Sequence, residues 1–269
     1  MIYLRTFQLS QETVRDPYIY PYNVFAHKEC GCFLFDRITI LYGNNASGKS
    51  TMLNLIAHVL NMEGREAATH NPRNPYFIQF AGECSYGLGE DEEGSPVRKI
   101  PADSRYIKSE DIMYEVKKIQ QEAVLKEGYL YEHARRGYTR EQLEELKHSG
   151  KMAKQIEILQ FAQEKYSNGE TALQILDDCL HPDALYLLDE PEVSLSPQNQ
   201  VLLADKLNRA ARFLDNQFII ATHSPFLLGT LSAKIYNLDS PDMETCRWNE
   251  LDNVRYFFLF FENHREEFL

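Results

Sequence analysis

The stretch that decides the fold reads Gly43-Asn44-Asn45-Ala46-Ser47-Gly48-Lys49-Ser50-Thr51. It has the G-x-x-x-x-G-K-S-T pattern of a phosphate-binding P-loop. An apolar, β-branched run at residues 38–42 precedes it and suits a buried strand, and residues 52–60 favour a helix. The motif therefore has the strand–loop–helix context that it requires. We interpret it as a P-loop rather than a glycine-rich turn that happens to end in Lys-Ser.

The residue types of this loop predict how it would hold a polyphosphate. Glycines let the backbone approach the anion closely, and the loop N–H groups and the helix N-terminus then face it. Lys49 is expected on the β- and γ-phosphates, with the Ser50 hydroxyl as a Mg²⁺ ligand. The loop alone does not distinguish a kinase, a GTPase, a transporter subunit and a repair ATPase.

Composition and charge set the broad class. The chain has 269 residues, of which 43% are hydrophobic and 25% charged, as in a globular protein with one large α/β domain. The N-terminus shows no signal-peptide pattern and no apolar run reaches about 18 residues, so we expect a cytoplasmic protein without a transmembrane segment. Five scattered cysteines are expected to be reduced thiols. A net charge of −12 argues against sequence-independent wrapping of bare nucleic acid, while a local basic groove or a basic protein partner stays open.

The first part of the chain predicts strands around the P-loop and then an insertion. Residues 2–9 predict an edge strand, and residues 17–35 predict two strands whose aromatic side chains either pack in the core or stack on adenine. Residues 76–80 suggest a short strand, and residues 105–107 a strand followed by a helix. Residues 61–165 are expected to form an inserted helical subdomain, with helices at about 139–148 and 151–164.

The second part alternates helices and strands. Helices are expected at residues 171–180 and 198–213, and strands at residues 185–188, 217–223 and 234–238. This alternation predicts an α/β fold, a mostly parallel central sheet with helices on both faces. Residues 253–269 predict an aromatic helix, which we expect to be buried against the sheet rather than to dock on a partner.

Three further polar sites occur where a predicted strand or loop gives way to the next element. Asp189 ends a buried strand and can hold Mg²⁺, and the adjacent Glu190 suits the orientation of an attacking water. His223 ends the next strand and is interpreted as a γ-phosphate sensor. The segment Ser167-Asn168-Gly169-Glu170 is a capping box that opens a helix. Its helix N-terminus can present N–H groups and a hydroxyl to an anion, on this chain or on a second copy.

Together these pieces resemble the heads of ABC-class ATPases. That family has, in order, a Walker A loop, a signature, a Walker B strand ending in Asp-Glu, a D-loop and a switch histidine. The corresponding segments here are Gly43–Thr51, Tyr166–Glu170, Leu185–Glu190, Ser194–Pro197 and His223. The chain is more closely similar to stand-alone bacterial AAA-family ATPases related to the RecF and SMC heads. In this sequence the signature reads Ser-Asn-Gly-Glu, and Gln79 and Glu110 are both candidates for the residue of the Q-loop, with Glu110 preferred.

The resemblance implies an organisation and a mechanism. The whole chain, 1–269, would be one ABC-type ATPase domain with a nucleotide-binding core (1–60 and 166–240), an inserted helical subdomain (61–165) and a helical tail (241–269). Two copies would dimerise head to tail around two ATP molecules, with the phosphates on residues 43–51 of one chain and 167–170 of the other. Ser50, Asp189 and Glu110 are the expected Mg²⁺ ligands. Lys49, Glu190 and His223 are the expected catalytic residues.

Four functions remain open from the sequence. The first is an ATP-hydrolysing switch that acts on a partner protein or on nucleic acid, with DNA repair or phage defence suggested by relatives. The second is the nucleotide-binding subunit of an ABC transporter. A small-molecule P-loop kinase would leave the Asp189-Glu190 pair and His223 without a purpose. An ATP-binding scaffold with negligible turnover is the non-enzymatic alternative.

Overall fold

A computed structural model describes residues 1–12, 16, 18–29, 32–66, 75–90, 94–114 and 168–269. They divide into two compact units. The first comprises Met1–Ser109, His181–Val193 and Gln200–Leu269, and the second comprises Glu110–Leu180 and Ser194–Asn199. In the part of the chain that the structure describes, no helix is both long and apolar enough to cross a membrane.

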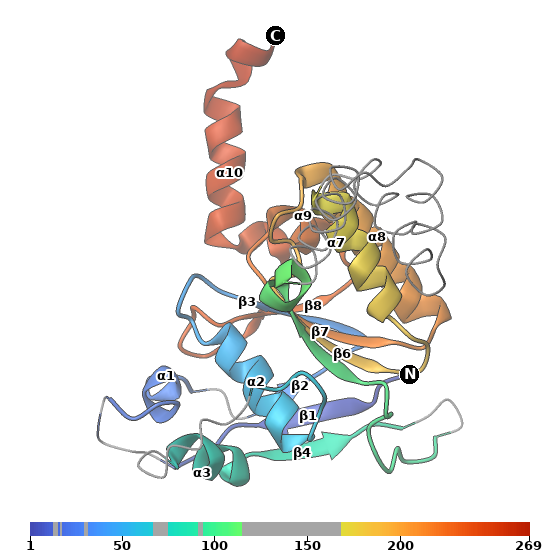
Figure 1. Ribbon diagram of the computed structural model, residues 1–269. Helices are drawn as coiled ribbons and strands as arrows, with labels where there is room; N and C mark the ends of the chain where they lie inside the picture. Colours follow the sequence, from blue (N-terminus) through green and yellow to red (C-terminus); the bar gives the residue numbers. More distant parts are fainter. Residues whose placement is uncertain (13–15, 17, 30–31, 67–74, 91–93, 115–167) are drawn as a thin grey trace, which may run out of the picture. The chain divides into compact units, whose positions relative to one another are not determined.

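A six-stranded sheet with the order β5-β6-β7-β3-β8-β9 forms the centre of the first unit (Figure 1). All neighbouring strands are parallel except the last pair, β8 and β9. The strands are β3 (Ile38–Tyr42), β5 (Arg105–Lys108), β6 (Leu185–Asp189), β7 (Gln217–Thr222), β8 (Lys234–Asn237) and β9 (Thr245–Cys246). Every residue of β3, β6 and β7 is buried, which explains their continuous apolar runs. The predicted α/β fold with a mostly parallel sheet is confirmed.

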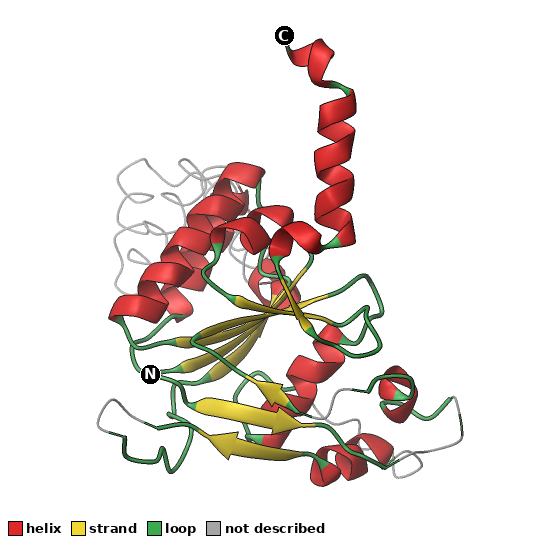
Figure 2. Ribbon diagram, turned by 180° about the vertical axis from the view of Figure 1, so that it is seen from behind, coloured by secondary structure: helices red, strands yellow, loops and turns green. Residues whose placement is uncertain are grey.

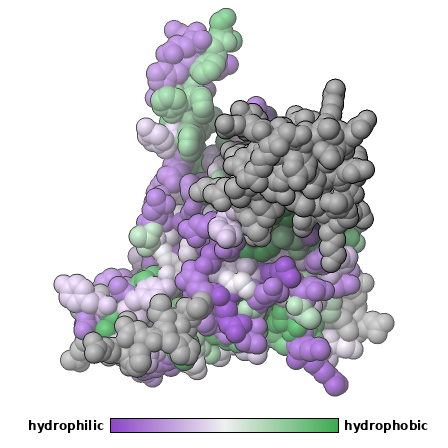
Figure 3. All heavy atoms as spheres, in the orientation of Figure 1, coloured by the Kyte–Doolittle hydropathy of each residue, from purple (hydrophilic) through white to green (hydrophobic). Residues whose placement is uncertain are grey.

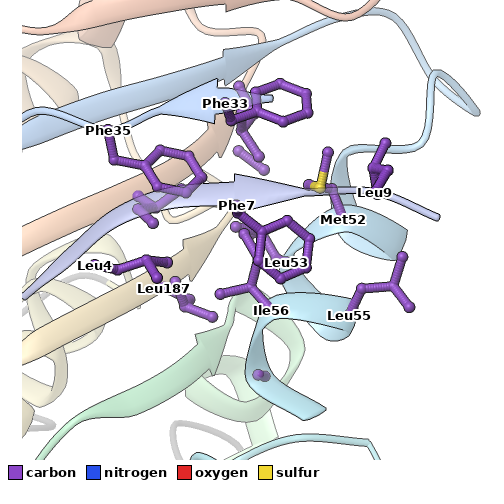
Figure 4. Packing of buried hydrophobic residues seen from close by; sticks show 14 of the residues in the cluster. Leu4, Phe7, Leu9, Phe33, Phe35, Met52, Leu53, Leu55, Ile56 and Leu187 are labelled. Carbon is purple, nitrogen blue, oxygen red and sulfur yellow. The ribbon is translucent and has the colours of Figure 1, made fainter. Parts of the chain in front are cut away.

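A second, antiparallel sheet with the order β2-β1-β4 lies below the first in Figure 1, and α2 (Lys49–Val59) lies between the two sheets. Its strands are β1 (Leu4–Gln8), β2 (Phe33–Leu34) and β4 (Ser85–Leu88). Side chains from β1, β2, β6 and α2 point toward one another and form a shared apolar core (Figure 4). α2 packs against β5, β6 and β7, so this core fixes the helix that follows the P-loop.

The remaining helices of the first unit are α1 (Tyr22–Phe25), α3 (Tyr76–Glu83), α8 (Pro197–Phe213), α9 (Pro225–Thr230) and α10 (Asp252–Asn263). The 3₁₀ helices η1 (Trp248–Glu250) and η2 (Arg265–Phe268) flank α10. α8 and α9 cover the face of the six-stranded sheet opposite α2, as both ribbon views show (Figure 2). The first three residues of α8 belong to the second unit, which also contains α7 (Asn168–Cys179).

Three strand predictions were wrong. β1 is the central strand of the small sheet and not an edge strand, because both β2 and β4 pair with it. Residues 17–35 contain α1 and the short β2 instead of two strands, since Pro21 precedes a turn of helix that buries Tyr22 and Phe25 on one side. Residues 76–80 lie in α3, which starts after Pro75 and buries Phe80, and Gln79 donates to Glu83 four residues on.

Two regional predictions also differ from the structure. The insertion was predicted to begin at residue 61, but residues up to Ser109 belong to the first unit, because β4 and β5 pair with strands of its two sheets. The helices predicted at 139–148 and 151–164 lie outside the described residues. The C-terminal helix is present as α10, yet Val254 is its only buried residue. The expectation that α10 packs against the sheet was wrong.

One buried side chain connects the two sheets. Gln217, at the start of β7, accepts hydrogen bonds through Oε1 from the backbone N–H groups of Tyr3 (2.8 Å) and Leu4 (2.9 Å). Its Nε2 donates to the carbonyl oxygens of Leu4 (2.8 Å) and Asp36 (3.1 Å). Four backbone groups, buried or partly buried, therefore depend on one amide.

We expect Gln217→Leu to lower the free energy of unfolding by about 3 kcal/mol or more, because it leaves several backbone groups unpaired. Urea denaturation measures the change. The matched control is Gln198→Leu on the exposed side of α8, which should change stability little. Equal stability of the two variants would show that Gln217 does not hold the sheets together.

Candidate functional site

The P-loop connects β3 to α2 with the backbone that its glycines permit. Gly48 is the N-cap of α2 with φ = 99°, and an added Cβ would lie 2.7 Å from Val24. A Cβ on Gly43 would lie 2.3 Å from the Ser47 hydroxyl oxygen. Ala46 adopts a left-handed φ of 66° between them. The loop is thus curved tightly enough to direct its amides at a bound anion.

Side chains from two other segments hold the start of the loop. Asp239, which follows β8, accepts from the backbone N–H of Asn44 at 3.0 Å and from its Nδ2 at 2.9 Å. Asn253, in the first turn of α10, donates to the Asn44 side-chain oxygen at 3.1 Å. Asn44 is therefore fixed by the loop after β8 and by the base of α10.

Lys49 is the first residue of α2 and is only 5% exposed. Its Nζ donates to the carbonyl oxygens of Gly43 (2.8 Å) and Asn44 (3.0 Å). It also lies 3.8 Å from the Glu190 carboxylate. A buried ammonium needs such partners, and here the loop's own backbone and one carboxylate supply them.

Asp189 ends β6 beside the beginning of α2. It is 8% exposed, and the Tyr106 hydroxyl donates to its Oδ2 at 3.0 Å. Burial raises the pKa of Asp189, and the neighbouring hydroxyls of Ser50 and Tyr106 only partly offset this effect. Its Oδ1 is buried and has no hydrogen-bond partner among the described residues. A carboxylate oxygen without a partner next to a serine hydroxyl fits a Mg²⁺ ion, whose preferred ligands are oxygens.

Glu190 and His223 meet at the ends of β6 and β7. The Nδ1 of His223 lies 3.4 Å from the Glu190 carboxylate, and Glu190 has a left-handed φ of 47° that turns the chain away after the strand. The His223 side chain is 45% exposed, so it can reach a ligand above the sheet edge. The structure thus brings together Lys49, Glu190 and His223, and their catalytic roles stay a prediction.

Glu192 accepts hydrogen bonds from the residues that position His223. Its buried carboxylate accepts from the Thr222 hydroxyl and, at 3.3 Å, from the backbone N–H of His223. Burial raises the pKa of Glu192, and the hydrogen bond from Thr222 partly offsets it. The following Ser224 caps α9 by accepting from the N–H groups of Phe226 and Leu227. Backbone and side-chain contacts on both sides of His223 therefore fix its position.

The other predicted residues have different outcomes. Asn45, Ala46 and Ser47 lie in the loop, and the Thr51 hydroxyl accepts from Tyr20 at 3.3 Å, which places an aromatic ring beside the P-loop. Glu110 is exposed, follows β5 and belongs to the second unit, so its role as a metal ligand stays a prediction. Ser167 lies outside the described residues. Asn168, Gly169 and Glu170 form the start of α7 in the second unit, and their nucleotide contact also stays a prediction.

Sequence reasoning missed four residues around the site. They are Tyr106, Glu192, Asp239 and Asn253. Glu192 lies in the segment that carried the Asp189-Glu190 prediction, and its signal was a third carboxylate two residues further on. Asp239 also follows a predicted strand, as Asp189 and His223 do, so the same rule applied to β8 would have found it. Tyr106 and Asn253 carried no signal in the sequence, because their contacts are set by the fold.

The comparisons with known proteins agree with these observations. The family described as "AAA domain, putative AbiEii toxin, Type IV TA system" matches residues 153–229, which include Asp189, Glu190 and His223. This match supports the resemblance to P-loop ATPases of the ABC class. No curated protein matches the sequence.

Several solved structures are similar to the chain. A Pyrococcus furiosus Smc head domain bound to the C-terminal domain of ScpA is 15% identical, with a TM-score of 0.44 over 98% of this chain and 100% of that one. The SMC head domain of Thermotoga maritima is 14% identical, with a TM-score of 0.42 over 90% and 97%. A nucleotide-free ATP-binding cassette from an ABC transporter is 12% identical, with a TM-score of 0.42 over 88% of each chain.

The buried carboxyl of Asp189 gives a prediction about pH. Because its folded-state pKa is raised above the unfolded value, its contribution to stability is fully present below the unfolded pKa and is lost as pH rises through the folded pKa. We expect Asp189→Asn to raise the melting temperature of the nucleotide-free protein at neutral pH. This gain should disappear at a pH below the ordinary range of an aspartate.

Calorimetry over a pH series without Mg²⁺ measures this effect. The control is Asp205→Asn on the exposed side of α8, which makes the same chemical change outside the site. If Asp189→Asn melts lower than the wild type at every pH, the carboxylate stabilises the empty site and our reading of its environment is wrong.

Proposed function

We propose that this protein is a Mg²⁺-dependent ATPase of the ABC class that closes head to tail with a second copy around two ATP molecules. The observation that carries the proposal is the convergence of Lys49, Asp189, Glu190 and His223 at the carboxyl edge of the parallel sheet, beside the P-loop. Ligands of open α/β sheets bind at this edge. The closure would act as a switch on a partner protein or on nucleic acid.

Each residue has a role that follows from its environment. The loop amides and Lys49 would bind the β- and γ-phosphates, and the bonds from Lys49 to the Gly43 and Asn44 carbonyls keep its ammonium group at the loop. Ser50 and Asp189 would hold Mg²⁺, and a bound metal would neutralise charge on the phosphates. We assign the ring of Tyr20, whose hydroxyl donates to Thr51, to contact with the base.

Glu190 is the proposed base that orients the attacking water, and His223 contacts the γ-phosphate. Glu190 is more exposed than Asp189 and lies within reach of both Lys49 and His223, so it can bind a water that faces the terminal phosphate. Asp189 is too deeply buried for that task. We therefore assign metal binding to Asp189 and activation of the water to Glu190.

The second half of each site is proposed to come from the other copy. Ser167, Asn168, Gly169 and Glu170 form the segment with the position and residue types of an ABC signature. A helix N-terminus of this kind favours a negatively charged phosphate. In a twofold arrangement the two composite sites are equivalent.

We expect Glu190→Gln to lower the ATP hydrolysis rate about 10²- to 10⁴-fold, because the water loses its base. ATP binding should be retained, because the P-loop and Asp189 are unchanged. Phosphate release and retention of labelled ATP are measured together. Glu244→Gln, an exposed change on the segment after β8, is the control. Unchanged phosphate release by Glu190→Gln would reject the assignment.

A mixing experiment tests the composite site. Lys49→Ala and Ser167→Arg should each abolish hydrolysis. A dimer of one variant with the other has one intact site of two, and about half of the dimers in an equal mixture are of this kind. The mixture should therefore regain up to about a quarter of the wild-type rate. Steady-state ATPase assays of each variant and of the mixture give the answer. A mixture as inactive as its components would contradict the shared site, and labelled phosphate on an added metabolite would indicate a kinase instead.

A further inference from the structure

α10 projects from the rest of the first unit and carries an unusual surface (Figure 1). The six consecutive residues from Tyr256 to Phe261 are all large and apolar or aromatic, and their exposed fractions lie between 45% and 69%. Hydrophobic colour follows this helix in the space-filling view (Figure 3). Apolar patches of this size on a soluble domain mark interaction sites.

The exposed surface continues from α10 into a groove. A cavity of about 750 Å³ lies between the start of α9, η1 and α10 and is lined mainly by apolar side chains. Phe226 and Trp248 contribute from α9 and η1, and Phe258 and Leu259 contribute from α10. All four residues are more than 40% exposed. The helix and the groove form one surface.

We propose that a second copy of this chain covers this surface, by antiparallel pairing of α10 with α10 of the other copy. Arg255, Phe258, Leu259 and Glu262 are spaced i, i+3, i+4 and i+7 and therefore share one face of the helix. In an antiparallel pair centred between Phe258 and Leu259, Arg255 of each copy lies opposite Glu262 of the other. Two opposite-charge pairs then flank an apolar centre.

The charges select this arrangement over the alternatives. A parallel pair would place Arg255 beside Arg255 and Glu262 beside Glu262, which is unfavourable. An anionic membrane surface is disfavoured, because Glu262, Glu266 and Glu267 outnumber Arg255 and Arg265 on this segment. Among the described residues, Arg255 is exposed and has no ion pair, so it is available to a partner carboxylate. Glu262 lies 3.4 Å from Arg265 of its own chain, and the pairing would give it a second cation.

The area is that of a small specific contact. An antiparallel pair covers one face of each helix, so Phe258 and Leu259 lie at its centre while Phe257 and Phe260 point away from the partner. Because a large apolar side chain can bury roughly 150–250 Å² and Tyr256, Phe258, Leu259 and Phe261 are more than half exposed, covering these four on both copies removes on the order of 800 Å² from water. Phe226 and Trp248 at the groove add to this area. The pairing needs no nucleotide, since none of these residues belongs to the P-loop site.

The test uses complementary charge reversals in a Lys49→Ala background without nucleotide, so that ATP-driven closure cannot contribute. Parent protein should sediment with twice the mass of one chain. Arg255→Glu and Glu262→Arg should each raise the dissociation constant at least about tenfold, because each places two like-charge pairs across the interface. An equal mixture of the two variants, and the double variant R255E/E262R, should both recover the parent affinity. Arg209→Glu on the exposed face of α8 is the matched control and should not change the mass.

Any of three results would overturn the proposal. The parent could sediment as a single chain at micromolar concentration, or the single variants could pair as tightly as the parent. The single variants could also fail to complement each other in the mixture. Monomeric parent protein that floats with vesicles of phosphatidylcholine and phosphatidylglycerol would assign the surface to lipid instead.

Discussion

The parallel register of β3, β7 and β6 is the constraint on which the rest of the site depends. Tyr42 pairs with Thr222 and Asp189 pairs with Ala221, so the three strands end at the same edge of the sheet. Three segments far apart in the sequence, the P-loop, the Asp-Glu pair and the switch histidine, are thereby brought together. Since every residue of these strands is buried, a shift of register would disrupt close packing on both faces of the sheet and is disfavoured.

The sequence was sufficient where one residue pattern dominates. The apolar runs before Gly43, Asp189 and His223 are short and favour buried strands, and the polar residues that follow such strands are expected at the sheet edge. The sequence was insufficient where contacts with residues far along the chain determine the local structure. Residues 76–80 have β propensity, yet α3 forms because Pro75 begins a helix and Phe80 fills the core. An all-round apolar helix such as α10 is normally buried, and only the fold shows that the described residues of this unit leave all of it but Val254 uncovered.

Three carboxylates within four residues illustrate how environment separates function. Asp189 is buried beside two hydroxyl groups, Glu190 is turned outward by its left-handed backbone, and Glu192 is buried and bound to Thr222. The sequence shows three carboxylic acids of similar intrinsic pKa, whereas the fold gives each a different exposure to water and a different partner. A role cannot be assigned to such residues from their spacing alone, which is why Glu192 was overlooked.

The contacts of Lys49 within its own loop have a consequence for the shape of that loop. The Nζ of Lys49 donates to the carbonyl oxygens of Gly43 and Asn44, so the first residue of α2 is tied to the first two residues of the loop. Because a buried ammonium without oxygen partners is costly, the loop can straighten only by breaking both hydrogen bonds. The lysine is therefore also a cross-link within the loop, and a shorter side chain at this position would relax the curvature as well as remove a charge.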